Sequence, residues 1–473
     1  MTAHRIARLF YGTVVQPSSL TRLEIARHAI VGVGHDGRVA FVRRNASLLQ
    51  LEETLQHCHT DQVVRLKDSQ FLLPGFVDTH IHASQYANAG NGLDLQLLDW
   101  LNEYTFPEEA RFQDPAYAAQ IYRRVVTHTL RTGTTCAAYF ATIHKEATEK
   151  LVDVMRDMGQ RGWVGKVCMN QNTPAWYRET PEQSVADTRH MIDHGDHVDV
   201  YHTAGLVEAC VTPRFAPHCT ADSMRKLGEL AREEGARTAQ SDPARGRTPI
   251  QSHLSENHGE IAWVRQLFPE ASSYTDVYAQ AGLLSPRTVM AHCVHLSQDE
   301  RDMLRTSGTA VSHCAHSNFN IRSGVLNVRR LLDEGIKVSL GTDMSGGHSA
   351  SMLDSIRGAI AASRMICIME HERPRAQLSI TETVYLATLG GIEAMGLQDR
   401  VGSLLTVGHE FDALLRSSSA DPIGSAPATA SGITPRKWYL DMLEKFLMCG
   451  DDRNILHVWV RGRRVAGAGD ASA

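Results

Sequence analysis

The segment GFVDTHIH, residues 75–82, places two histidines at the end of a short apolar run. The run has the composition of a buried strand. Because alternate residues of a strand share a face, His80 and His82 are expected to point to the same side. Neutral imidazoles are good ligands for Zn²⁺ or Fe²⁺, although two histidines alone are also typical of an ordinary surface. The segment therefore predicts a strand whose carboxyl end can contribute to a metal site.

Seven further apolar runs follow, and each precedes a polar, helix-like segment. They are TTCAAYF (134–140), WVGKVCM (163–169), LVEACVTPRF (206–215), PIQSHLSE (249–256), TVMAHCVHL (288–296), TAVSHCAHSN (309–318) and KVSLGTDM (337–344). Apolar strands that alternate with helices indicate buried parallel strands. Eight such units predict an α/β fold with a (β/α)8 TIM-type barrel over residues 75–400. A doubly wound open sheet remains the alternative.

The polar residues of these runs gather at their carboxyl ends, and this pattern favours the barrel. Arg214, His253, His292 and Asp343 all stand late in their runs. A parallel barrel brings all of its strand ends to one rim, where residues far apart in sequence converge.

Both ends of the chain also have strand-like runs, at 62–73, 411–416 and 455–465. The stretch at 420–435 is rich in Pro, Gly, Ser and Ala and is typical of a loop. We expect residues 1–74 and 401–473 to form one small composite β-sandwich domain.

Composition narrows the class of protein. The 473 residues include 48 basic and 53 acidic side chains, for a net charge of -5, and no basic run supports a nucleic-acid partner. No apolar stretch is long enough for a membrane span, and the first residues do not resemble a secretory signal. The nine cysteines form no CxxC pair, which indicates reduced thiols and a cytoplasmic protein without a membrane partner.

Three strand-end histidines and one carboxylate can supply four ligands to a single divalent ion: His80, His82, His253 and Asp343. A catalytic site of this kind keeps a position open for water, and the cation lowers the pKa of that water. His292 fits as a hydrogen-bond partner of the water.

Two carboxylates are candidates for proton transfer at this site. Asp343 can accept a proton from water, and Glu256, three residues after His253, is expected to shuttle one at the strand end; a solvated loop carboxylate is the alternative for Glu256. A second metal would need a bridging group. Lys166 lies in the middle of its run and is expected to be a packing lysine, so we predict one metal.

The motifs PGFVDTHIHAS, QSHLSEN, MAHC and LGTDM together resemble the amidohydrolase superfamily, in its mononuclear aminohydrolase branch. The segments HIHASQYANAG, YTFPEEARFQ, YFATIH, GKVCMN, VTPRF, LGTDMSGG, LATLGG and GDDRNI are similar to the guanine deaminase family. The resemblance extends from about residue 8 to 465. It implies a metal-bearing barrel, hydrolysis of guanine to xanthine and ammonia in purine catabolism, one Zn²⁺ per chain (Fe²⁺ being possible) and a homodimer.

The resemblance also assigns roles to residues. It gives metal binding to His80, His82, His253 and Asp343, proton transfer to Glu256, and a place beside the water to His292. Guanine recognition falls to Gln85, Arg214 and Phe215. An amide both donates and accepts, an arginine donates to a carbonyl, and a phenyl ring can stack on a purine.

Some segments depart from the family pattern. Residues 238–249 look like an inserted exposed loop, and Ala315 replaces a proline beside an extra rim histidine, His316. The segment 93–106 predicts an amphipathic helix. Its Trp100 is expected either to cover the site or to pack against the rest of the protein without a role at the site. The alternatives to guanine hydrolysis are action on another purine, a pterin or a triazine, and a catalytically inactive scaffold.

Overall fold

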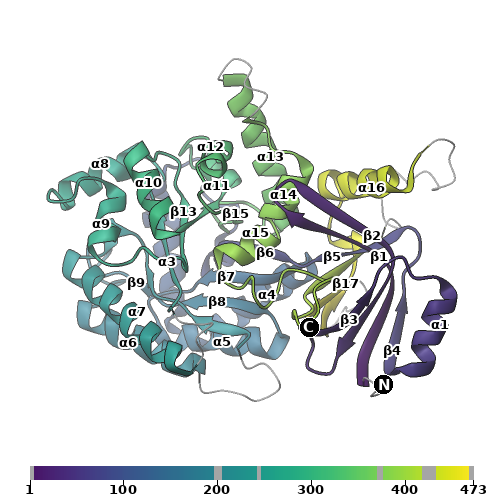
Figure 1. Ribbon diagram of the computed structural model, residues 1–473. Coiled ribbons are helices and arrows are strands. Elements are labelled where there is room, and N and C mark those ends of the chain that lie inside the picture. The colour runs from purple at the N-terminus through teal and green to yellow at the C-terminus, as the bar shows by residue number, and fades with distance from the viewer. Residues whose placement is uncertain (1–4, 197–204, 242–246, 370–375, 418–432, 468–473) are drawn as a thin grey trace.

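The computed structural model describes residues 5–196, 205–241, 247–369, 376–417 and 433–467. Strands from both ends of the chain lie together on one side of the molecule, and helices and short strands from the middle of the chain make up the rest (Figure 1). Among the described residues, no helix has both the length and the apolar character needed to cross a bilayer.

The terminal strands form one hydrogen-bonded sheet. Its members are β1 (Arg5–Ser19), β2 (Arg22–Gly34), β3 (Val39–Arg43), β4 (His59–Arg65), β5 (Gln70–Pro74), β16 (Ala413–Ser417), β17 (Ile455–Val460) and β18 (Arg463–Gly467). Their order is β18-β17-β16-β5-β1-β2-β3, with β4 beside β1. In the antiparallel pair β5–β16, Leu73 lies opposite Leu414. The two ends of the chain therefore build one sheet.

Aromatic side chains of the two chain ends pack against one another at this sheet. The ring of Phe10 stacks on Phe411 at a centroid distance of 4.7 Å and meets the edge of Trp459 at 5.1 Å. A second apolar cluster, which includes Leu9, is covered by Leu51 of helix α1 (Leu48–His57). Helix α16 (Pro435–Cys449) begins at the end of the predicted loop 420–435, of which residues 420–432 lie outside the described ranges.

All eight predicted runs of the central region contain strands. These are β6 (Phe76–His82), β7 (Thr134–Phe140), β8 (Arg161–Gly165), β9 (Val167–Cys168), β10 (Val207–Ala209), β11 (Thr212–Pro213), β12 (Ile250–Leu254), β13 (Thr288–His292), β14 (Ala310–His313) and β15 (Val338–Leu340). The third and fourth runs are each divided into two short strands, β8 with β9 and β10 with β11.

The central strands are parallel and follow each other in space in their chain order. They form the series β6-β7-β8-β10, β9-β11 and β12-β13-β14-β15. A parallel bridge between Val211 and Ile250 links the first half to the second. On the other side, the backbone N–H of Asp343 donates to the carbonyl of His80 (2.8 Å), and that of His82 donates to Met344 (3.0 Å). This arrangement is consistent with a TIM-type barrel.

Helices connect successive strands. They are α2 (Leu97–Trp100), η2 (Leu101–Thr105), α3 (Phe106–Ala110), α4 (Pro115–Arg131), α5 (Lys145–Met158), α6 (Pro181–Asp196), α7 (Ala221–Ser241), α8 (His258–Leu267), α9 (Tyr274–Gln280), α10 (Gln298–Ser307), α11 (Ala315–Asn320), α12 (Val328–Asp333), α13 (Met352–Met369), α14 (Ile380–Leu386) and α15 (Leu389–Ala394), with the short turns η1 (Ser84–Asn88), η3 (Arg111–Gln113), η4 (Ala216–His218) and η8 (Asp452–Asn454). Helix α7 extends to Ser241, so the expected loop 238–249 begins as helix; residues 242–246 lie outside the described ranges.

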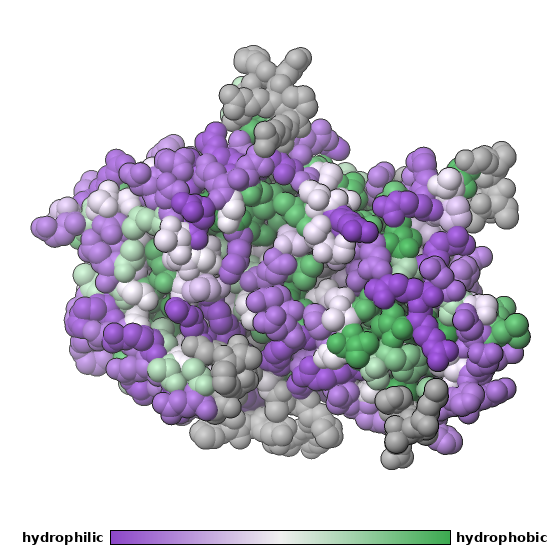
Figure 2. Space-filling view, in the orientation of Figure 1, coloured by the Kyte–Doolittle hydropathy of each residue, from purple (hydrophilic) through white to green (hydrophobic). Residues whose placement is uncertain are grey.

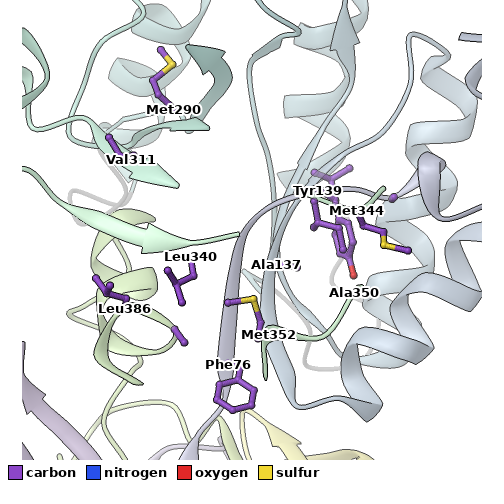
Figure 3. Packing of buried hydrophobic residues seen from close by; sticks show 14 of the residues in the cluster. Phe76, Ala137, Tyr139, Met290, Val311, Leu340, Met344, Ala350, Met352 and Leu386 are labelled. Carbon is purple, nitrogen blue, oxygen red and sulfur yellow. The ribbon is translucent and has the colours of Figure 1, made fainter. Parts of the chain in front are cut away.

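Buried hydrophobic residues hold the central strands against their helices. Figure 3 shows Ala137 and Tyr139 of β7, Met290 of β13 and Leu340 of β15 in this cluster, and each of them is fully buried. On the surface, by contrast, hydrophilic residues predominate, and hydrophobic ones form patches between them (Figure 2), as is usual for a folded domain.

A buried ion network joins the central strands to the terminal sheet. The guanidinium of Arg161, in β8, donates from Nε to Asp412 (2.7 Å) and from Nη2 to Glu410 (2.7 Å). The side chains of all three residues are less than 5% exposed. Because breaking such a buried pair leaves an unpaired charge, this contact fixes where the two regions meet.

Candidate active site

Four predicted metal ligands come together at the carboxyl ends of the central strands. Ligand atoms of His80, His82, His253 and Asp343 all lie within 4.8 Å of one another. The first two end β6, the third lies in β12, and Asp343 follows β15. His80 Nε2 is 3.1 Å from Asp343 Oδ1, and His82 Nε2 is 3.1 Å from His253 Nε2.

Burial sets the protonation of this cluster. It lowers the pKa of His80, and it lowers the pKa of His82 and His253 well below the ordinary value. These imidazoles are therefore neutral near pH 7, the state in which they bind metals. Burial would raise the pKa of Asp343, but the neighbouring imidazoles, His80 first, outweigh this and hold the pKa below its usual range.

The residues present fit a divalent cation. The Nδ1–H of His253 donates to the carbonyl of Arg214 at 2.7 Å, and because a carbonyl only accepts, the lone pair of Nε2 is left to face the cluster. Two ligands bound to one tetrahedral Zn²⁺ lie about 3.3 Å apart, given metal–nitrogen bonds of about 2.0 Å. The separations of 3.1 and 3.4 Å from His82 to His253 and Asp343 match this spacing.

Two titratable groups stand beside the four ligands. His292 Nε2 lies 3.6 Å from Glu256 Oε2 and 3.6 Å from Asp343 Oδ2. Burial would lower the pKa of His292, but the two carboxylates outweigh it and raise the pKa. Burial raises the pKa of Glu256 to about 7. Glu256 can thus hold or release a proton near neutral pH, as a general acid or base requires.

The backbone is strained where the strands end. His292 has a φ of 70° and Asp343 a φ of 47°, both in the left-handed region that non-glycine residues rarely adopt. The carboxylate of Asp78 accepts from the backbone N–H of His80 (3.2 Å) and of Thr342 (3.0 Å). These bonds anchor the turn that presents Asp343. Strained backbone of this kind concentrates at functional sites.

A cavity opens onto the cluster. Its lining consists of His82, Gln85, Leu97, Trp100, Leu101, Arg214, Phe215, His253, Glu256, His292, Ile321 and Asp343. All of the site residues predicted from the sequence are in this lining, apart from His80, which is 1% exposed behind it.

The three residues expected to recognise the substrate all line the cavity. Gln85 lies in η1, and Arg214 and Phe215 follow β11. The ring of Phe215 contacts His218 edge-on at 4.3 Å. These residues place an amide, a guanidinium and an aromatic ring beside the metal-ligand cluster, which are suitable groups for a flat polar ring.

Sequence reasoning missed three residues that support the site. Glu109, in α3, accepts hydrogen bonds from Gln85 (3.0 Å) and Arg214 (2.7 Å). The hydroxyl of Ser323 contacts Glu256, and the side chain of Asn318 contacts His292. Glu109 lies in the family-like segment YTFPEEARFQ, but nothing in that segment indicates which of its two adjacent glutamates is buried.

Other predicted features lie around or outside the cavity. The helical segment at 93–106 starts later than expected, at Leu97, and Trp100 lines the cavity while its indole N–H donates to the carbonyl of Asn91 (2.9 Å). His316 contacts the carbonyl of Asp354 and is not one of the four clustered ligands. Lys166 is buried in an ion pair with Glu179.

Comparison with known proteins shows which family the chain matches and which proteins are similar to it. The model of the amidohydrolase family matches residues 71–465. The chain is 41% identical to guanine deaminase of Dictyostelium discoideum, over 98% of this chain and 99% of the relative. It is 39% identical to guanine deaminase of Homo sapiens, over 97% of each chain.

A solved structure is similar over almost the same length. The crystal structure of guanine deaminase from C. acetobutylicum with guanine bound in the active site superposes with a TM-score of 0.84 at 33% identity, covering 97% of this chain and 100% of that one.

Proposed function

We propose that this chain, which belongs to the amidohydrolase family, hydrolyses guanine to xanthine and ammonia. The observation that carries the proposal is the convergence of the four clustered ligands, Glu256 and the pair Gln85–Arg214 on one cavity. Relatives named guanine deaminase that share 39–41% of their residues over nearly the whole chain support the same reaction.

In this proposal His80, His82, His253 and Asp343 hold one divalent cation, Zn²⁺ by preference, with Fe²⁺ as the alternative that the same donor set permits. When bound, the cation makes water acidic enough to act as a nucleophile near neutral pH. The ionised carboxylate of Asp343 accepts a proton from the attacking water, and His292 holds that water by a hydrogen bond.

Glu256 supplies the protons that the ring and the leaving group need. Its pKa of about 7 leaves a large protonated fraction at neutral pH. The acid protonates the ring nitrogen next to the carbon that carries the amino group, which makes this carbon electrophilic. The oxygen of water bonds to the carbon, and the ionised Glu256 then takes the remaining proton of this oxygen and passes it to the amino group. The carbon–amino bond breaks, ammonia leaves with a carbonyl formed at the carbon, and the proton held by Asp343 returns to Glu256.

Gln85, Arg214 and Phe215 bind and orient the purine in this scheme. Arg214 donates to the guanine carbonyl and disfavours an amino group at the same position, because a guanidinium has no acceptor. The amide of Gln85 pairs with a ring edge that both donates and accepts. Phe215 contacts the ring face.

The same proposal extends to the architecture. We assign residues 75–400 to a closed (β/α)8 barrel, supported by the hydrogen bonds from His80 and His82 to the segment after β15. Residues 1–74 and 401–473 form the composite β-sandwich domain, supported by the aromatic cluster around Phe10. The family resemblance supports a cytoplasmic homodimer with one zinc per chain. Sedimentation tests the dimer, and metal analysis tests the zinc content.

An ultraviolet assay with a mixture of purines tests the function. We expect selective loss of guanine with xanthine as the product, together with about one tightly bound metal ion per chain. Conversion of another purine, a pterin or a triazine instead of guanine would redirect the assignment. Absence of both turnover and metal would favour a scaffold.

A further inference from the structure

Glu109 is a buried carboxylate that does not line the cavity but contacts two residues that do. Its side chain is 0% exposed. Oε1 accepts from Gln85 Nε2 at 3.0 Å, and Oε2 accepts from Arg214 Nη1 at 2.7 Å and from the hydroxyl of Tyr177 at 2.8 Å. A single group thus connects η1, the segment after β11 and the chain between β9 and α6.

The contact with Glu109 fixes which way the amide of Gln85 points. A carboxylate only accepts, so it must face the NH₂ group of the amide. On the other side, the backbone N–H of Ser345 donates to Gln85 Oε1 at 3.3 Å. Both contacts select the same orientation of the amide. One N–H and one lone pair of Gln85 are then left for a ligand, in a defined order.

Glu109 also compensates the charge of Arg214. The two side chains are at most 4% exposed, and a buried guanidinium without a counterion is costly. Phe106, from the same helix as Glu109, lies under the guanidinium at 5.3 Å from its carbon to the ring centroid. Helix α3 therefore supplies both the counterion and a flat support, and it leaves the other guanidinium N–H groups in a fixed direction.

We propose that Glu109 is a positioning residue that sets the hydrogen-bonding polarity of the Gln85–Arg214 pair and through it the affinity for the purine. The inference rests on the proposed function, because it takes guanine as the ligand. It assigns no chemical step to Glu109, since the side chain touches neither the cavity nor the four clustered metal ligands. Glu109 strengthens binding of the ground state and the transition state equally. Removing it should therefore raise KM without lowering kcat.

The substitution Glu109→Gln tests this with a side chain of the same shape. Its NH₂ group would face a donor on either Gln85 or Arg214, so one of the two must turn away. We expect KM for guanine to rise about 10- to 100-fold, the range for loss of a charged hydrogen bond, with kcat within about threefold and the metal content unchanged. A KM within about twofold of the unsubstituted protein would overturn the inference.

Glu108→Gln is the matched control. Glu108 is the neighbouring residue of the same helix, but its carboxylate pairs with Arg111 at 2.9 Å and with Tyr117, away from the cavity. We expect its kinetics to match the unsubstituted protein. If E108Q raises KM as much as E109Q does, the effect belongs to the helix and the inference fails.

Glu109→Asp covers the case in which E109Q does not fold. It keeps the charge beside Arg214 but is one methylene too short to reach Gln85 as well, so KM should rise while kcat is kept; an unchanged KM would overturn the inference. The unsubstituted protein is assayed in parallel. If it does not convert guanine, the proposed function fails. If it is active and E109Q has the same KM for guanine, only the role of Glu109 is contradicted.

Discussion

The hydroxyl of Ser323 donates a hydrogen bond of 3.0 Å to Oε1 of Glu256. Ser323 lies in the turn after α11, which follows β14, and Glu256 lies just beyond β12, so the contact joins the segments that follow two strands on either side of β13. Burial raises the pKa of Glu256 to about 7, while this hydrogen bond favours the carboxylate and opposes the increase. Ser323 therefore tunes the group that we propose as the proton donor.

Replacing Ser323 by Ala should shift the pH dependence of turnover. Loss of the hydrogen bond destabilises the carboxylate, so the pKa of Glu256 rises further. Because Glu256 must carry a proton to act as an acid, kcat falls as the pH rises through this pKa, and in S323A the fall should move to higher pH by up to about one unit, equivalent to about 1.4 kcal/mol. The pH profile of kcat measures the shift. Ser307→Ala, at the end of α10, is the control and should leave the pH profile unchanged. If kcat of S323A falls at the same pH as kcat of the unsubstituted protein, the role of Glu256 as the acid is contradicted.

Replacing Glu256 by Gln should separate metal binding from catalysis. The amide cannot deliver a proton, so we expect turnover of guanine to fall by about 10²- to 10⁴-fold. Glu256 is not among the four clustered ligands, and the bound metal should remain at the level of the unsubstituted protein. Metal analysis and steady-state kinetics on the same preparation provide both values. A fully active E256Q would remove the proposed role.

Removing the metal should abolish activity reversibly. Three neutral imidazoles and one carboxylate form the candidate site, and a chelator that strips the ion leaves water without an activating cation. We expect activity to return on addition of Zn²⁺ or Fe²⁺, and Asp343→Asn to bind the ion more weakly. His316→Ala, which alters a histidine outside the cluster, should keep both metal and activity. Full turnover by the chelated protein would exclude a metal-dependent reaction.

The positions of the strand-end residues could be predicted because two regularities determine them. Alternation along a strand places His80 and His82 on one face, and parallel strands bring their carboxyl ends together. The first rule needs only the sequence of one strand, and the second holds for any set of adjacent parallel strands. His253 and Asp343 could therefore be assigned to the same cluster although they are far apart in the chain.

The supporting residues follow no such rule. Glu109 and Ser323 lie in connections, where the helix or turn geometry and not strand alternation decides which side chain is buried. Glu108 and Glu109 are adjacent and chemically identical, yet one pairs with Arg111 and the other with Arg214. The third run is divided into β8 and β9 on either side of Lys166, and the local sequence does not show that Lys166 forms a buried ion pair with Glu179.

The join between the two regions of the molecule is predicted to depend on Glu410. This carboxylate accepts from the guanidiniums of Arg38 (2.9 Å), Arg161 (2.7 Å), Arg400 (3.2 Å) and Arg461 (3.0 Å). Burial alone would raise the pKa of Glu410, but the arginines outweigh it, Arg161 most strongly, and lower the pKa to about 2. A carboxylate with a lowered pKa stabilises the folded state above its unfolded pKa, and this contribution is lost as the pH falls toward about 2.

Glu410→Gln should therefore lower the free energy of unfolding at neutral pH by about 3 kcal/mol, because it removes one partner of a buried ion pair. Denaturation by urea at several pH values measures the difference, which should shrink below about pH 4.5 as Glu410 of the unsubstituted protein loses its advantage. Glu229→Gln is the control, since Glu229 pairs with Arg225 on the surface and such pairs contribute about 1 kcal/mol or less. Equal losses for E410Q and E229Q, or a difference that is the same at every pH, would show that the ion network does not hold the two regions together.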